Sequence, residues 1–295
     1  MSLSRLSLQR RRLYSAGLLV YLAGLRAAGM EPLASVDLGA LQIALIASTV
    51  AILVYALVVL LFYPLRSLIE STAAGALTTA LASTGGLLPA MSQPLSGAQL
   101  LAAWLAFSAL WHLALYGAWW QAVPLRLDWR TRRGFVTSAA PTRAWAVLVP
   151  NPAAPGDHYS GTFLGQEPIA GAPDTVVERT SAGPGLVQES TICFEVKDPP
   201  RRLAYRYHAG RDPVDADYGS GRFDLSLDDH PEGTSVTFQE TVCQMVVPTA
   251  LMLWFDDFGG EIRMSMRAAL EGTRDRTRWL RDRRIGQTTN GPSQP

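Results

Sequence analysis

One apolar segment, from Leu38 to Phe62, constrains the fold of this chain most, because no charged residue occurs from Leu38 through Pro64. A helix rises about 1.5 Å per residue, so roughly 20 apolar residues cross the ~30 Å core of a bilayer. The segment is long enough to do so with some tilt. We therefore predict a membrane-spanning helix over residues 38–63.

A second apolar segment, residues 98–123, is interrupted only by His112. Trp119 and Trp120 near its end are typical of the aromatic belt at a membrane interface. His112 lies near the middle of this predicted span, and ionisable residues at that depth are candidates for function. We expect a neutral histidine that is hydrogen-bonded inside the bundle; a proton relay or a haem ligand is the alternative. No other histidine occurs in the membrane half, so we expect no cofactor.

Two weaker segments complete the predicted membrane region. Residues 13–30 contain Arg26, and residues 68–89 are rich in small residues, which permit close packing of helices. Glu70, in the first turn of the latter segment, is expected to reach the lipid headgroups. Arginines cluster before the first segment and after the last: Arg5, Arg10, Arg11 and Arg12, then Arg126, Arg130, Arg132 and Arg133.

The positive-inside rule places both arginine clusters, and hence both termini, on the cytoplasmic side, which requires an even number of spans. We prefer four spans (13–30, 38–63, 68–89 and 98–123) in the inner membrane of a bacterial cell. Two spans are the alternative.

Composition separates this membrane region, residues 1–125, from a second half in which charged residues, Gly and Pro are frequent. A net charge of +1 gives no argument for nucleic acid as a partner. The two cysteines, Cys193 and Cys243, both fall in predicted strands, where two buried free thiols are expected rather than a disulfide or a metal pair.

Short segments of alternating polarity begin at Gly134 and are separated by turn motifs such as KDPP and HPEGT. Apolar residues two positions apart, such as Leu203, Tyr205 and Tyr207, indicate strands of an antiparallel sheet with one apolar face. A last segment, residues 248–270, has apolar residues three and four positions apart, which predicts one long helix. The fold class is therefore α+β, with the transmembrane helical bundle first.

Three stretches of this second half resemble the START-like superfamily of helix-grip domains, also called SRPBCC or polyketide-cyclase-like proteins: FVTSAAPTRAWAVL, RFDLSLDDHPEGTSVTFQET and MSMRAALEG. The resemblance covers residues 134–272. It implies a curved antiparallel sheet wrapped on a long C-terminal helix, with a hydrophobic cavity for lipids, sterols or polyketides between them. The Pro/Gly-rich residues 150–173 and the membrane spans depart from the family pattern.

The resemblance also implies which aromatic side chains line the cavity, unless they simply fill it: Tyr205, Tyr207, Phe223, Phe238, Trp254 and Phe258.

Catalytic residues are not apparent in the second half. The histidines are too scattered to bind a metal, and no nucleophile or phosphate-loop motif occurs. Asp228 and Asp229 precede a turn, where solvated residues are expected. Asp256 and Asp257 are neighbours on the predicted helix, and adjacent helical side chains diverge by about 100° and cannot face one another. We expect no catalytic site, no metal and no cofactor.

The tail, residues 273–295, begins with an arginine-rich stretch and ends in a segment typical of disorder. We expect Arg278, Trp279 and Arg281 to contact the anionic membrane surface; a solvated continuation of the helix is the alternative.

Together these features predict a membrane-tethered binding or carrier protein for an apolar ligand, such as a lipid, an isoprenoid or a pigment-like molecule, at the cytoplasmic face. Its partners would be the lipid bilayer and an apolar small molecule, and not nucleic acid. An accessory or assembly subunit of a larger membrane protein complex is the alternative. An enzyme of cyclase or hydrolase type is the third hypothesis.

Overall fold

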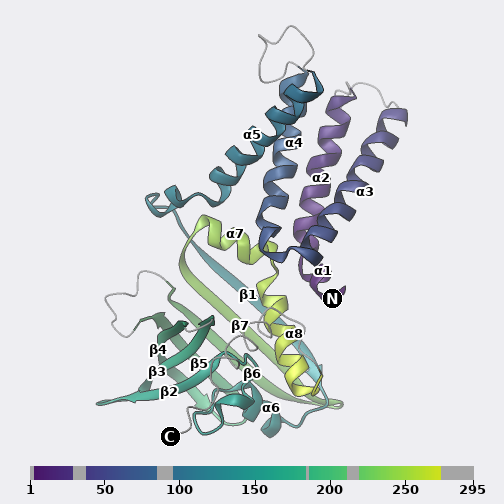
Figure 1. The fold of residues 1–295 in the computed structure, drawn as a ribbon. Helices are drawn as coiled ribbons and strands as arrows, with labels where there is room; N and C mark the ends of the chain where they lie inside the picture. The colour runs from purple at the N-terminus through teal and green to yellow at the C-terminus, as the bar shows by residue number, and fades with distance from the viewer. Residues whose placement is uncertain (1–2, 29–37, 85–95, 184–185, 211–218, 274–295) are drawn as a thin grey trace, which may run out of the picture. The chain divides into compact units, whose positions relative to one another are not determined.

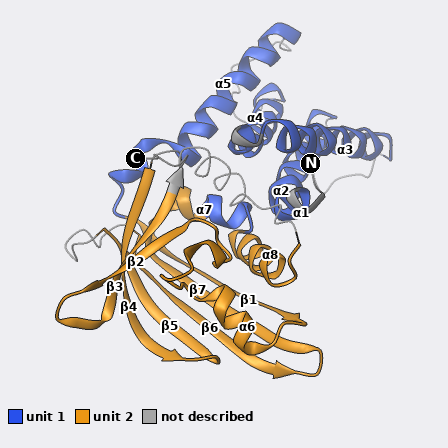
Figure 2. Cartoon of the chain, turned by 60° about the horizontal axis from the view of Figure 1, so that its bottom comes forward, with its two compact units in different colours: residues 1–124, 251–257 blue, residues 125–250, 258–295 orange. Residues whose placement is uncertain are grey.

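The computed structural model describes residues 3–28, 38–84, 96–183, 186–210 and 219–273, and these form two compact units. Residues 1–124 together with 251–257 make up the helical unit, and residues 125–250 together with 258–295 make up the sheet unit (Figure 2). A short segment from late in the chain thus belongs to the helical unit.

The helical unit is built from helices that pack side by side along their lengths. Their order is α1 (Leu3–Leu8), α2 (Arg10–Ala27), α3 (Leu38–Leu61), the 3₁₀ turn η1 (Tyr63–Ser67), α4 (Leu68–Ser83), α5 (Gly97–Tyr116) and η2 (Ala118–Gln121). Helix α2 packs against both α3 and α4, and α4 packs against α5 (Figure 1). Each of the four predicted apolar segments thus contains a helix within its described residues, and α5 ends at Tyr116, before the predicted end of its segment.

Small residues allow these helices to approach closely. Gly75 of α4 faces Ser108 of α5 so tightly that a Cβ atom would collide with the serine hydroxyl and backbone nitrogen. Ala16 of α2 and Ala73 of α4 are both fully buried. The small-residue composition of the 68–89 segment thus serves packing within the bundle.

Two of these helices are long and apolar enough to cross a membrane, by length and composition alone: Leu38–Leu61 and Gly97–Gln121. In the most apolar 18-residue stretch of each helix, only 17% of the first and 6% of the second is buried. Helices α2 and α4 do not pass the same test among the described residues. The helical bundle is therefore present, whereas its crossing of a membrane by four helices stays a prediction.

The sheet unit contains one antiparallel sheet of seven strands in the order β1-β7-β6-β5-β4-β3-β2. The strands are β1 (Arg126–Thr137), β2 (Phe163–Ile169), β3 (Ala172–Gly183), β4 (Leu186–Asp198), β5 (Arg202–Ala209), β6 (Gly221–His230) and β7 (Gly233–Val246). Strands β2 to β7 are joined as successive neighbours, while β1 pairs with β7 at the far edge.

Two helices lie against one face of this sheet, α6 (Pro141–Leu148) and α8 (Phe258–Leu270), and the 3₁₀ turn η3 (Pro155–Asp157) follows α6 (Figure 2). Period-two alternation points Phe223, Leu225 and Leu227 of β6 toward the helices, where they join Ile262 and Met266 of α8 in the core. This arrangement fits the helix-grip fold that the sequence predicts.

The prediction of one long helix over 248–270 is wrong. Helix α7 (Val247–Phe255) ends before Asp256, and α8 begins at Phe258. Asp257 has a φ of +45°, in the left-handed region that cannot continue a helix. The two glycines that follow Phe258 also have low helix propensity, which weakens a helix at this point. The apolar residues keep a helical spacing across residues 248–270, although the helix itself is interrupted between α7 and α8.

The first strand also begins earlier than predicted, at Arg126 rather than Gly134, and pairs with β7 along its length. The sequence predicts only a charged flank of the preceding span for its arginines. On an edge strand these side chains can point to solvent while the backbone of β1 pairs with β7. A search for apolar alternation therefore does not recognise this charged segment as a strand.

Candidate ligand cavity and buried ion network

A cavity of about 210 Å³ lies in the sheet unit, between the sheet and α8. Five adjacent strands contribute to its wall, together with α8 and the segment that follows α6. Its lining includes apolar and aromatic side chains together with two carboxylic acids, Glu178 and Glu240. The other lining residues include Tyr159, Ser190, Ile192, Leu203, Tyr205, Tyr207, Phe223, Phe258 and Ile262.

Stacked aromatic rings form one wall of the cavity. Tyr205 of β5 stacks on Phe223 of β6, with 5.3 Å between the ring centroids. Phe223 in turn stacks on Phe238 of β7, at 6.2 Å. Phe238 is fully buried and belongs to the core behind this wall. The rings are held by cross-strand neighbours, so the wall is rigid.

Glu240 of β7 meets a tyrosine that reaches it across the intervening strand. The Tyr207 hydroxyl, from β5, donates a hydrogen bond of 3.0 Å to Glu240 Oε1. Between them lies Gly221 of β6, where a Cβ atom would approach the Tyr207 hydroxyl to 2.5 Å. Only glycine leaves the ring room to cross β6, so this residue positions the Tyr207–Glu240 pair.

Glu178 of β3 also lines the cavity, and three strands separate β3 from β7. Its Oε2 accepts a hydrogen bond of 3.1 Å from Gln166 Nε2 of β2. Burial raises the pKa of Glu178 to about 7, and that of Glu240 likewise to about 7. Each carboxyl thus changes charge near neutral pH, which is common in functional sites.

Three tyrosines of the cavity keep their protons. Burial raises the pKa of Tyr159, Tyr205 and Tyr207 well above the usual value. Both glutamates raise the pKa of Tyr159 and Tyr205 further, and Glu240 alone does so for Tyr207. Their hydroxyls therefore remain hydrogen-bond donors at any physiological pH. His158, also in the wall, bonds through Nδ1 to the Ser160 hydroxyl at 2.8 Å.

Four of the six predicted cavity residues line it: Tyr205, Tyr207, Phe223 and Phe258. Phe238 is in the core, because Phe223 stands between it and the cavity. Trp254 belongs to the helical unit instead, because the helix breaks after α7. There it is 45% exposed, and the Arg11 guanidinium lies 5.3 Å from its ring. Arg278, Trp279 and Arg281 lie outside the described residues.

Sequence reasoning missed the two glutamates of the cavity. The alternation of Val236 and Phe238 continues to Glu240, which places this acid on the inner face of β7. The same period applied to β3 puts Glu178 beside Val176. For Glu240, an acid that follows Val236 and Phe238 on one strand face was the signal that could have identified it. The face of Glu178 also holds Asp174 and Thr180, so its sequence pattern gave no such signal.

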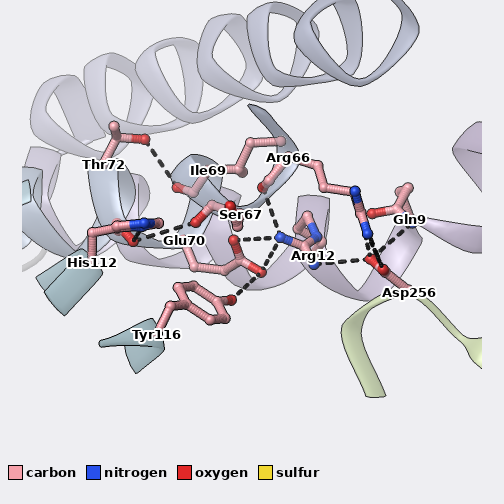
Figure 3. A network of polar contacts seen from close by, with 11 residues as sticks. Gln9, Arg12, Arg66, Ser67, Ile69, Glu70, Thr72, His112, Tyr116 and Asp256 are labelled. Carbon is pink, nitrogen blue, oxygen red and sulfur yellow. Dashed lines mark hydrogen bonds and ion pairs between the residues drawn. The ribbon is translucent and has the colours of Figure 1, made fainter. Parts of the chain in front are cut away.

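A buried ion network lies in the helical unit, around Arg12 of α2 (Figure 3). The Arg12 side chain is fully buried; its Nη1 lies 2.6 Å from Glu70 Oε1 and donates to the Arg66 carbonyl at 2.7 Å. Its Nη2 lies 2.9 Å from Asp256 Oδ1. The Arg66 guanidinium also pairs with Asp256, at 3.0 Å, and Gln9 donates to the same carboxylate at 3.2 Å.

The network contains two guanidinium groups and two carboxylates, so its charges balance. Burying one charge alone is costly, whereas paired and hydrogen-bonded charges offset much of their desolvation. Asp257 points elsewhere, toward Arg10 and Arg11 at 3.8 and 3.6 Å. The adjacent acids Asp256 and Asp257 thus serve different partners and form no acid–base pair.

Glu70 of α4 and His112 of α5 each contact polar side chains of the helical unit. Glu70 is 3% exposed and receives a hydrogen bond of 3.2 Å from the Tyr116 hydroxyl, so it does not reach headgroups. Its pairing with Arg12 is the physical reason. His112 Nδ1 lies 3.4 Å from the Ser71 hydroxyl, and its ring packs beside Tyr116. Both contacts are with side chains of the bundle itself, as expected for a histidine that is hydrogen-bonded inside it.

Within the ranges that the structure describes, no three His, Cys, Asp or Glu side chains are grouped to hold a metal ion.

No model of a known protein family matches the chain, and no curated protein matches it in sequence. Solved structures do match in part. Ara h 8.0201 is 10% identical, with a TM-score of 0.37 over 50% of this chain and 97% of that one. Protein CV1439 from Chromobacterium violaceum is 15% identical, with a TM-score of 0.34 over 48% and 97%. The Mll3558 protein from Rhizobium loti is 16% identical, with a TM-score of 0.36 over 50% and 98%.

Proposed function

We propose that this chain is a membrane-anchored protein that binds a small amphipathic molecule in the cavity of its sheet unit. The observation that carries the proposal is the composition of the cavity wall. Apolar and aromatic side chains such as Ile192 and Phe223 face a few convergent polar groups, Tyr207 and Glu240 among them. This combination is typical of small-molecule sites.

The volume of the cavity limits the ligand. An apolar cavity of about 150 Å³ holds one benzene ring, and drug-sized ligands occupy pockets of about 300 to 1,000 Å³. A volume of about 210 Å³ therefore suits a single ring with short substituents, or one end of a longer molecule. A lipid, isoprenoid or pigment-like ligand, as the sequence predicts, would enter by one end only.

Membrane insertion of the helical unit is supported by its outer surface. Large apolar side chains of α3 and α5 are more than half exposed, among them Ile43, Leu53, Leu101 and Leu105. The core helix of a soluble protein would bury such residues, whereas lipid stabilises them. We propose four spans, with α2 and α4 as the less apolar members, in the inner membrane with both termini cytoplasmic.

The accessory-subunit alternative loses one of its arguments. An accessory subunit of a membrane complex could use the small residues of α4 as a docking face for another membrane protein. Ala73 and Ala80 are buried, and Gly75 is in contact with Ser108 of the same chain. Those residues already serve the packing of this bundle, so binding of a ligand is the better-supported function.

An enzyme that transfers a proton is the second candidate, because one observation favours it. Glu178 and Glu240 have pKa values of about 7 inside a cavity, which is the range in which a general base is most effective. Cyclase-type chemistry on a bound ring would need such a base.

A cavity-filling variant tests ligand binding. Full-length protein in lipid nanodiscs would be examined by saturation-transfer NMR with benzyl alcohol, which has one ring and no charge. We expect saturation transfer to wild-type protein and a several-fold loss in Ser190→Phe, whose ring would occupy the cavity. Ser226→Phe, on the opposite face of the sheet, is the matched control. Equal signals from wild type and Ser190→Phe would contradict the proposal.

A further inference from the structure

We propose that the ligand of this cavity is an organic cation, an amine whose ammonium group binds at Glu178 and Glu240 while its hydrocarbon part packs on the aromatic wall. This inference rests on the proposed function and adds the chemical class of the ligand.

The two carboxyl groups converge from separate strands. Glu178 is on β3 and Glu240 on β7, with β4, β5 and β6 between them, yet both line one cavity. Both also act electrostatically on Tyr159 and Tyr205, which lie in the same wall. A group inside the cavity therefore lies within the field of two acids at once.

In the described cavity wall these acids have no guanidinium or ammonium partner, and the histidine of the wall, His158, bonds through Nδ1 to the Ser160 hydroxyl. Among the described residues that line the cavity there is no lysine and no arginine. Each carboxyl accepts a side-chain hydrogen bond from a neutral donor, Gln166 for Glu178 and Tyr207 for Glu240. An ionised carboxylate can accept about four hydrogen bonds, so both have capacity left. An ammonium group brings three N–H donors together with the missing positive charge.

The aromatic wall favours the same class of ligand. Tyr205 and Phe223 line the cavity with stacked rings, and Tyr159 and Tyr207 add two further rings. A cation over an aromatic ring face is attracted by the ring quadrupole, and aromatic cages are a common mode of ammonium recognition. Neutral ligands gain neither this term nor the charge pairing, and anions would be repelled by the carboxylates.

Three probes of nearly equal size separate charge from shape: benzylamine, benzyl alcohol and benzoate. Binding to the full-length protein would be measured by titration in nanodiscs of zwitterionic lipid at pH 8, where benzylamine is protonated. We expect benzylamine to bind at least about tenfold more tightly than benzyl alcohol, a difference of about 1.4 kcal/mol. Benzoate should be the weakest of the three.

The paired variant E178Q/E240Q removes both charges with almost no change in shape. It should bind benzylamine and benzyl alcohol equally, and benzoate better than wild type does. The control E232Q removes one charge from an exposed turn outside the cavity and should keep the wild-type preference. Retained folding of each variant would be verified by its thermal unfolding.

The inference is overturned if wild type binds benzyl alcohol as tightly as benzylamine, or if the preference persists in E178Q/E240Q. In both cases the cavity still binds ligand and the proposed function stands. Failure of every probe to respond to Ser190→Phe would instead overturn the proposed function itself.

Discussion

Arg12 and Asp256 are 244 positions apart in the chain, and Arg12 Nη2 lies 2.9 Å from Asp256 Oδ1 in the buried ion network. The contact joins the start of α2 to the point at which the helical character of residues 248–270 is interrupted. Residues 251–257 are thereby held within the helical unit. If α7 continued through Asp256, the carboxylate would point in another direction and would lose its contact with Arg12. The ion pair therefore requires the helix to end before Asp256.

Asp256→Ala should destabilise the helical unit strongly, because it leaves the buried Arg12 and Arg66 without a shared partner. Removal of one member of a buried pair typically costs about 3 to 5 kcal/mol. The matched control is Asp257→Ala, whose partners Arg10 and Arg11 are partly exposed, and which should cost about 1 kcal/mol or less. Thermal unfolding in detergent would compare the two.

The contrast between these neighbouring residues is what matters. Equal losses of stability in Asp256→Ala and Asp257→Ala would contradict the claim that Asp256, and not Asp257, belongs to the buried ion network.

The stability of the sheet unit should fall as pH rises from about 4.5 to about 7. Burial raises the pKa of Glu178 and Glu240 to about 7, above the ordinary value of 4.5. In this window the folded state holds more protons than the unfolded state, so unfolding becomes easier as pH increases. Each group contributes up to about 3 kcal/mol, and the loss is complete above pH 7.

E178Q/E240Q removes both titrations and should flatten this part of the pH profile. The other ionisable side chains of the cavity wall are His158 and the three tyrosines, which remain in the variant. Thermal unfolding at pH 5 and pH 8 would show a larger gain for the variant at pH 8. An unchanged slope between the two pH values in the variant would argue against burial as the cause.

Tyr207→Phe should cost more stability at pH 8 than at pH 5. Its hydroxyl donates to Glu240, and a hydrogen bond to a charged acceptor contributes about 1.5 to 3 kcal/mol, against about 0.5 to 1.5 for a neutral one. The carboxyl is mostly charged only at the higher pH. Unfolding curves at both pH values would measure the difference, and a loss that is independent of pH would contradict it.

Gly75→Ala should loosen the contact between α4 and α5. The added Cβ would collide with the backbone as well as the hydroxyl of Ser108, so a helix has to move. Overpacking of this kind costs about 1 to 3 kcal/mol. Gly97→Ala is the control, because no atom lies within 4 Å of the Cβ that it adds. Thermal unfolding in detergent should separate the two variants; equal stability would show that α4 and α5 are less tightly packed.

Local patterns predicted the parts of this fold that depend on local order. Period-two alternation placed Tyr205, Tyr207 and Phe223 on the inner face of the sheet, where they line the cavity. Glu178 and Glu240 line the same cavity. A search for alternating apolar residues does not identify them, because both residues are acids. Charge on β1 concealed a strand whose pairing partner lies about a hundred residues away.

Long-range contacts explain the other errors. Apolar spacing runs unbroken through Trp254 and Phe258, and nothing near Asp256 in the sequence reveals that its partners are Arg12 and Arg66. The helix break therefore could not be predicted, and Trp254 was assigned to the wrong unit. A pairing over 244 positions is set by tertiary structure, which overrides helical propensity.

Native mass spectrometry of the full-length protein, released gently from the membranes of the cell that makes it, tests the account most directly. We predict a bound molecule of about one ring's size, or one end of a longer chain, that carries a basic nitrogen and is absent from Ser190→Phe. A wild-type protein that is always empty, or one whose adduct is equally abundant in Ser190→Phe, would contradict ligand binding in this cavity.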